Sequence, residues 1–117
     1  MNFIMRIIVT AVVAFGLSYI LKGGIHIDEF TTALILALVL AVFNAILKPI
    51  LIILTLPITI LTFGLFLFVI NAVIILLAAH FVDGFRVDGF WWALLFSLLL
   101  STLTSFLYRG EAERRNN

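Results

Sequence analysis

Four polar side chains stand in or beside otherwise apolar stretches of this sequence. Asn44 and Asn71 lie inside runs of aliphatic and aromatic residues, and Lys48 and His80 lie near the ends of such runs. An unpaired amide in hydrocarbon loses several kcal/mol, so both asparagines need partners. Hydrogen bonds between helices would satisfy that need. A substrate or ion site at Asn44 and Asn71 is the alternative.

The polar residues do not form the groupings that catalysis or metal binding requires. His80 has no second His, Glu or Cys at ligand spacing, so we expect an interfacial hydrogen-bonding role for it and no metal site. Lys48 can lay its stem along apolar surface and extend its ammonium group to the headgroups. No carboxylate pair, no nucleophile with a base and no glycine-rich phosphate loop stands out. We therefore expect no enzyme activity, no cofactor and no metal.

The composition identifies the lipid bilayer as the solvent of this protein. Hydrophobic residues make up 65% of the 117 residues and charged residues 11%. One small core cannot hide that much apolar surface from water, so lipid must cover the remainder. The seven basic residues are spread along the chain and form no stripe for nucleic acid. We expect an all-α membrane protein with a single integral membrane domain over residues 1–117.

Four apolar runs have lengths typical of membrane-spanning helices. The predicted spans are 3–21, 31–47, 65–82 and 91–107. No small-residue cleavage pattern follows the first run, so we expect it to remain as a span and not to be a signal peptide.

The apolar stretch 49–82 is too long for one span. As a single helix it would measure roughly 50 Å, against a hydrocarbon core of about 30 Å, so it must break. Pro49 is expected to end the second span, because the residue before a proline disfavours helix. Pro57 and Gly64 then set off residues 50–63 as a short re-entrant or interfacial segment.

The two halves of the chain repeat each other with an offset of sixty residues. The repeat is predicted over residues 1–47 and 63–109, and its clearest matched positions, 28–34 with 88–94, stand sixty apart. A period of this kind indicates two copies of one structural unit. The offset maps the first span onto the third and the second onto the fourth. We therefore expect four spans arranged as two repeated hairpins of equal orientation.

The charges favour one orientation of these hairpins. Two hairpins of equal orientation require the segment 50–63 to return to its starting side. Arg6, Lys48 and Arg109 then all lie inside, which satisfies the positive-inside rule. We expect a multi-pass protein of the inner (plasma) membrane with both termini in the cytoplasm.

The two outer loops carry a strand signal. Residues 25–30 and 85–90 alternate apolar and polar side chains at period two. An isolated strand is not stable, so the loops are expected to pair with each other and form a small outer β cap.

Small residues recur at every fourth position on the second and fourth predicted spans. These ridges consist of Ala33, Ala37, Ala41 and Ala45, and of Ala93, Ser97, Ser101 and Ser105. Small side chains on one helical face let helices approach closely in lipid, so we expect helix packing, within the chain or between copies. Pore lining is the alternative for the serines, although their hydroxyls can also bond carbonyls of their own helix.

The chain resembles a known family of small bacterial membrane proteins. The resemblance rests on the stretches 44–51, 54–57 and 84–90 and on Asn71, and it covers nearly the whole chain. The family is the four-transmembrane phage holin family, also called mycobacterial phage holin superfamily IV. It implies an inner-membrane protein with four spans, and it offers no catalytic residues to carry over.

Three functions fit these observations. The first is a non-enzymatic holin-like membrane protein that acts through helix packing, as a homo-oligomer or with a membrane-protein partner. The second is a membrane-permeabilising holin pore, which needs a long polar face. The third is a small transporter or channel with its site at Asn44 and Asn71.

The predicted topology can be tested with introduced cysteines, because the chain has none of its own. A cysteine in the C-terminal tail should be shielded from a membrane-impermeant thiol reagent added to intact cells. A cysteine in the loop at Lys22 should react. Labelling of the tail from outside would contradict this topology.

Overall fold

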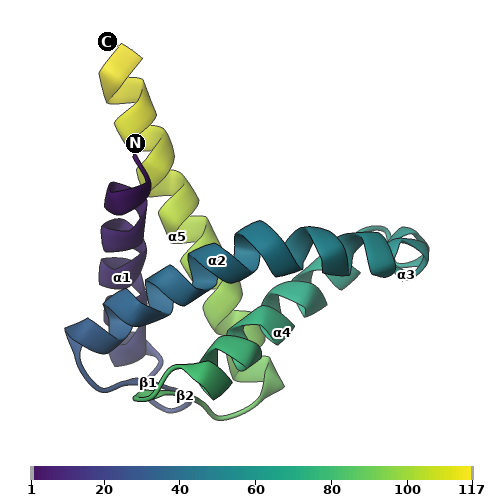
Figure 1. Cartoon of the computed structure of the whole chain (residues 1–117), viewed down its shortest axis with the longest axis horizontal. Helices are drawn as coiled ribbons and strands as arrows, with labels where there is room; N and C mark the ends of the chain where they lie inside the picture. The colour runs from purple at the N-terminus through teal and green to yellow at the C-terminus, as the bar shows by residue number, and fades with distance from the viewer. Residues whose placement is uncertain (1, 117) are drawn as a thin grey trace.

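Helices and one short β ladder make up the fold (Figure 1), seen in a computed structural model that describes residues 2–116. The elements in chain order are α1 (Phe3–Ile20), β1 (Ile25–Ile27), α2 (Phe30–Leu54), α3 (Leu56–Leu61), α4 (Phe66–Phe81), β2 (Phe85–Val87) and α5 (Phe90–Asn116). In the described chain, α1, α2 and the Phe90–Arg109 part of α5 are long and apolar enough to cross a membrane, and α4 is a shorter apolar helix. The helical class is thus confirmed, with three long apolar helices and one shorter one.

The two strands form an antiparallel ladder that joins the two halves of the chain. Its pairs are Ile25 with Val87, His26 with Arg86, and Ile27 with Phe85. Beyond the ladder, the Asp28 amide donates to the Gly84 carbonyl at 3.0 Å, and the Asp88 amide donates to the Gly24 carbonyl at 2.9 Å. The loop pairing predicted from the alternating sequence is confirmed.

The register of the ladder is symmetric about its central pair. His26 and Arg86 stand sixty positions apart and face each other. The two flanking hydrogen bonds are related in the same way. Asp28 in one bond corresponds to Asp88 in the other, and Gly84 corresponds to Gly24, each sixty positions apart. This is the arrangement that a two-fold axis through the ladder would produce. The internal repeat itself stays a prediction from the sequence.

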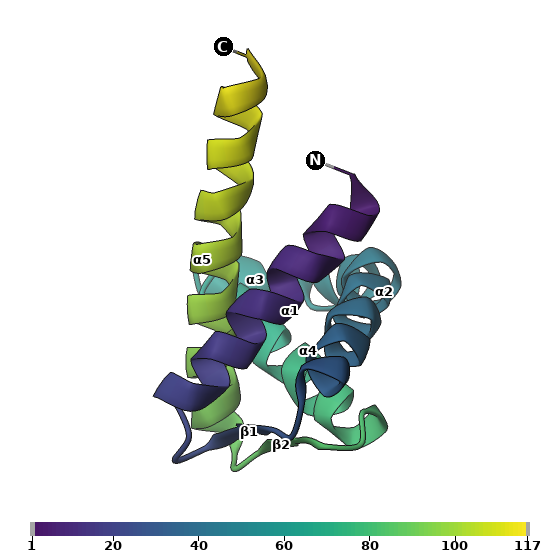
Figure 2. The same cartoon turned by 90° about the vertical axis from the view of Figure 1, so that its left-hand side faces the viewer.

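The helices leave the ladder and separate into two arms. Figure 1 shows α1 and α5 in one arm and α2 and α4 in the other, which ends at α3. Both termini lie at the end of the molecule opposite the ladder (Figure 2). The largest fully buried side chains are Phe85, Phe96, Ile25, Leu36 and Ile74. Two of these, Ile25 and Phe85, belong to the ladder itself, so the ladder is part of the buried core.

The expectation that Pro49 ends the second helix is wrong. Helix α2 continues through Pro49 to Leu54. The missing amide of an internal proline deprives one carbonyl, that of Ala45, of its usual partner, and apolar membrane helices tolerate this through local adjustment. The chain turns instead at Thr55, whose amide and hydroxyl both reach the Leu51 carbonyl, at 3.0 and 2.7 Å.

The predicted segment 50–63 is therefore divided differently. Its first five residues belong to α2, and the remainder forms α3 and a turn. Pro57 lies in the first turn of α3, where a missing amide costs no helical bond. Gly64, with φ of 87°, follows Phe63, with φ of 55°, in a left-handed turn that leads to α4. Both predicted helix-breaking positions, Pro57 and Gly64, lie where the chain changes direction.

Gly24 lies where an indole ring covers the backbone at the start of β1. A Cβ atom at Gly24 would lie only 1.9 to 2.2 Å from atoms of the Trp92 ring, including the ring atom next to its own Cβ. Moving that ring atom requires rotation about the Trp92 Cα–Cβ bond, which would take the whole indole away from Gly24. Only glycine lets Trp92 pack against the ladder.

Replacing Gly24 with alanine should therefore lower the free energy of unfolding, by about 1–3 kcal/mol for an overpacked site. Gly16→Ala is the matched control, because a Cβ there meets nothing within 4 Å. In a helix interior that change should be neutral or stabilising, by up to about 1 kcal/mol. Thermal unfolding in detergent micelles measures both variants, and equal melting temperatures would contradict the close approach.

Candidate functional site

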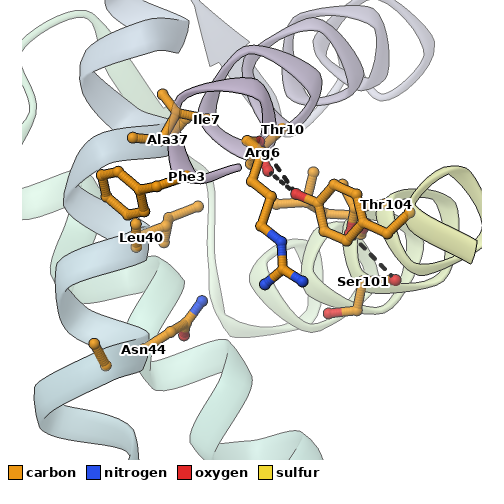
Figure 3. Close-up of a pocket in the computed structure, with 13 residues that line it drawn as sticks. Phe3, Arg6, Ile7, Thr10, Ala37, Leu40, Asn44, Ser101 and Thr104 are labelled. Atoms are coloured by element: carbon orange, nitrogen blue, oxygen red, sulfur yellow. Dashed lines mark hydrogen bonds between the residues drawn. The ribbon is translucent and has the colours of Figure 1, made fainter. Parts of the chain in front are cut away.

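A cleft opens between the arms, at the end away from the ladder (Figure 3). It has a volume of about 420 Å³, and α1, α2 and α5 all contribute to its walls. Its polar side chains are Arg6, Thr10, Asn44, Ser101, Thr104 and Tyr108, and its larger apolar ones are Phe3, Ile7, Leu40 and Leu100. The cleft is therefore amphipathic.

Tyr108 joins α5 to α1 at the mouth of the cleft. Its hydroxyl donates to the Arg6 carbonyl at 3.1 Å and lies 2.7 Å from the Thr10 hydroxyl. The Arg6 guanidinium lies over the Tyr108 ring, 5.1 Å from the ring centroid. Figure 3 shows this guanidinium extending into the cleft, on the side of Asn44. One aromatic side chain thus fixes both the backbone and the charged group of Arg6.

Asn44 and Asn71, which lie in separate apolar runs, meet at a second cavity. This smaller space of about 50 Å³ lies between α2, α4 and α5, and Lys48 and Ser97 also line it. Asn44 and Ser101 line both the cavity and the cleft. The structure therefore brings three of the four sequence-predicted polar residues to one place.

The asparagines do not form the hydrogen bonds between helices that we expected. Among the side chains that the structure describes, neither Asn44 nor Asn71 has a hydrogen-bond partner in the protein. Asn44 is exposed and Asn71 is half-buried, so both amides can be reached from the cavities they line. Both amides border the small cavity between α2, α4 and α5, so the neighbouring helices are present but do not supply a bonded partner.

His80 lies apart from this group. It occupies the last turn of α4, is exposed, and packs edge-on against Phe81 with ring centroids 5.3 Å apart. In residues 2–109, no three His, Cys, Asp or Glu side chains come together in a way that could hold a metal ion.

The small-residue ridges pack only near the ladder. The buried members are Ala33, Ala37, Ala93 and Ser97, and the open members are Ala41, Ala45, Ser101 and Ser105, of which Ala41 is half-buried. Ala41, Ala45 and Ser101 line the cleft. Ser105 lies outside it, in a shallow hollow beside Phe106 and Arg109. Each ridge thus packs within the chain over its first half and leaves its second half uncovered.

Arg6, Thr10 and Tyr108 are functional candidates that we did not predict from the sequence. A signal was present, because Arg6 and Thr10 are four apart on α1 and Thr104 and Tyr108 are four apart on α5. Such spacing places each pair on one helical face. From the sequence we used Arg6 only to orient the chain, and we did not consider which helix faces meet.

Comparison with known proteins gives consistent results. The family model described as mycobacterial 4 TMS phage holin, superfamily IV, matches residues 1–106. The uncharacterized membrane protein YvlD of Bacillus subtilis (strain 168) is 43% identical over 91 residues, covering 77% of this chain and 76% of that protein. The uncharacterized protein SCO3922 of Streptomyces coelicolor is 40% identical over 99 residues, covering 78% and 79%. No solved structure matches.

Proposed function

Since the chain belongs to the mycobacterial 4 TMS phage holin superfamily IV, we propose that it is a non-enzymatic multi-pass protein of the bacterial inner membrane that acts through helix packing and self-association. In this proposal both termini and α3 face the cytoplasm, and the ladder lies outside. The positions of the charges support it. Arg6 in α1 and Arg109 in α5 lie toward the end of the molecule that carries both termini. Lys48 lies in α2, away from the ladder, so these basic residues lie on the proposed cytoplasmic side.

The open half of the α5 ridge carries the proposal of self-association. Ser101, Thr102 and Ser105 are exposed on a helix that lipid surrounds, and with Phe106 and Arg109 they form a shallow hollow. Small side chains allow another helix to approach closely, and hydroxyl groups can bond across the contact. The α5 helix of a second copy presents the same surface, so two copies can pack ridge against ridge.

Leucine substitutions at the two ends of this ridge should have different effects. Ser105→Leu should weaken dimerisation about tenfold, because a contact of this kind contributes roughly 1–2 kcal/mol. It should leave the melting temperature unchanged. Ser97→Leu should lower the melting temperature, because Ser97 is only 4% exposed and a larger side chain there would overpack the helix contact. Energy transfer between labelled copies in liposomes measures dimerisation, and an unchanged signal for Ser105→Leu would contradict this interface.

The two alternative functions rest on different residues. A permeabilising pore needs a wet polar face, but the Ser97 and Thr104 hydroxyls bond carbonyls of their own helix, those of Leu94 and Leu100, at 2.9 and 2.7 Å. A small transporter or channel is the better supported alternative, because Asn44, Asn71 and Lys48 line one cavity.

Controlled expression in cells loaded with a membrane-potential dye separates these functions. We expect the potential to remain intact at high expression, because packing alone opens no conductive path. Rapid loss of potential would favour the permeabiliser and contradict the proposal. A slow loss that Asn44→Ala abolishes, and that Thr102→Ala on the exposed face of α5 retains, would favour the transporter or channel.

A further inference from the structure

Charge is unevenly distributed along the molecule, and the cleft lies at its basic end. The acidic side chains that the structure describes, Asp28, Glu29, Asp83 and Asp88, all lie in the loops at the ladder end. Arg6 lines the cleft and Lys48 the adjoining cavity, and no carboxylate of residues 2–109 lines either space. Within residues 2–109 the acid–base contact is that of His26 with Asp88, at 3.5 Å. The two cations at the cleft therefore have no carboxylate partner among the described side chains.

Contacts with Tyr108 hold the Arg6 guanidinium in place. The guanidinium carbon lies over the Tyr108 ring, 5.1 Å from the ring centroid, and the Tyr108 hydroxyl donates to the Arg6 carbonyl at 3.1 Å. Its free edge extends into the cleft, where the Asn44 amide and the Ser101 hydroxyl supply further hydrogen-bond donors. A planar guanidinium with two donors nearby is well suited to a tetrahedral oxyanion, which it can bind through two parallel hydrogen bonds.

The other wall of the cleft has a different character. Phe3, Ile7 and Leu40 give it an aromatic and aliphatic surface directly beside the polar groups. A small inorganic anion would leave this wall uncovered. A molecule with an anionic head and a hydrocarbon chain would cover both walls at once.

We propose that the cleft binds the phosphate headgroup of an anionic phospholipid from the leaflet at the end of the molecule that carries the termini. Arg6 pairs with the phosphate oxygens, Asn44 and Ser101 donate to them, and an acyl chain lies along the apolar wall. This proposal can fail separately from the proposed self-association. Ser101 lines both the cleft and the α5 hollow, but Arg6 lines the cleft and not the hollow, and Ser105 lines the hollow and not the cleft.

A site of this kind differs from ordinary anchoring at the membrane surface. An arginine that only extends to the headgroup region contacts many lipids in turn and does not saturate. The cleft should instead retain about one lipid for each chain, with preference for a headgroup of net negative charge. The distinction can be measured on purified protein.

The experiment compares lipids retained by the full-length protein in detergent, by native mass spectrometry at equal concentrations of phosphatidylglycerol and phosphatidylcholine. The wild-type chain should retain phosphatidylglycerol in preference. Arg6→Gln should weaken that retention roughly tenfold, since charge-assisted hydrogen bonds are lost. Lys22→Gln is the matched control, because it removes one exposed cation near the ladder and should leave retention unchanged.

Three outcomes would overturn the proposal. These are equal retention of the two lipids by the wild-type chain, retention by Arg6→Gln equal to wild type, and an equal loss in Lys22→Gln. Displacement of phosphatidylglycerol by millimolar inorganic phosphate would assign the cleft to a free anion and overturn the lipid assignment. The comparisons on wild-type protein decide the question even if Arg6→Gln does not fold, and circular dichroism detects that case.

Discussion

The short antiparallel ladder between residues 25–27 and 85–87 determines where the helices are held together. Ile25 and Phe85 are fully buried within it, and the Phe85 ring lies 5.8 Å from that of Phe96 in α5. The ladder is thus part of the hydrophobic core as well as a connection between loops. Four helices begin or end beside it, so their separation grows with distance from it. The cleft, the cavity and the uncovered ridge halves all follow from this divergence.

Much of the fold could be predicted from local patterns. The alternation at 25–30 and 85–90 gave the strand pairing, and the length of the stretch 49–82 required a break. The position of that break was harder to predict, because the rule that proline ends a helix comes from chains in water. In an apolar helix Pro49 removes one hydrogen bond, whereas Thr55 can turn the chain while its hydroxyl satisfies a carbonyl.

The candidate site could be predicted only in part. Asn44, Asn71 and Lys48 could be identified because polar groups are costly in lipid. Their convergence depends on how α2, α4 and α5 cross, and a sequence period does not contain that information. The small-residue ridges show the same limit of sequence-based prediction. Their spacing places Ala37 and Ala45 near one helical face, but it does not reveal that Ala37 is buried while Ala45 is exposed where the helices have diverged. Tyr108 and Arg6 were missed because their contact joins opposite ends of the chain.

In the proposed four-span topology, the ladder also sets a condition on how the chain is inserted into the membrane. Its strands are sixty residues apart, so β1 remains unpaired until β2 has been synthesised and has crossed to the same side. A chain with one hairpin inserted upside down would place the two strands on opposite faces of the bilayer, where they could not pair. Such a chain would lose the buried contacts of Ile25 and Phe85. Under that topology, a complete core requires both loops to lie on the same side of the membrane.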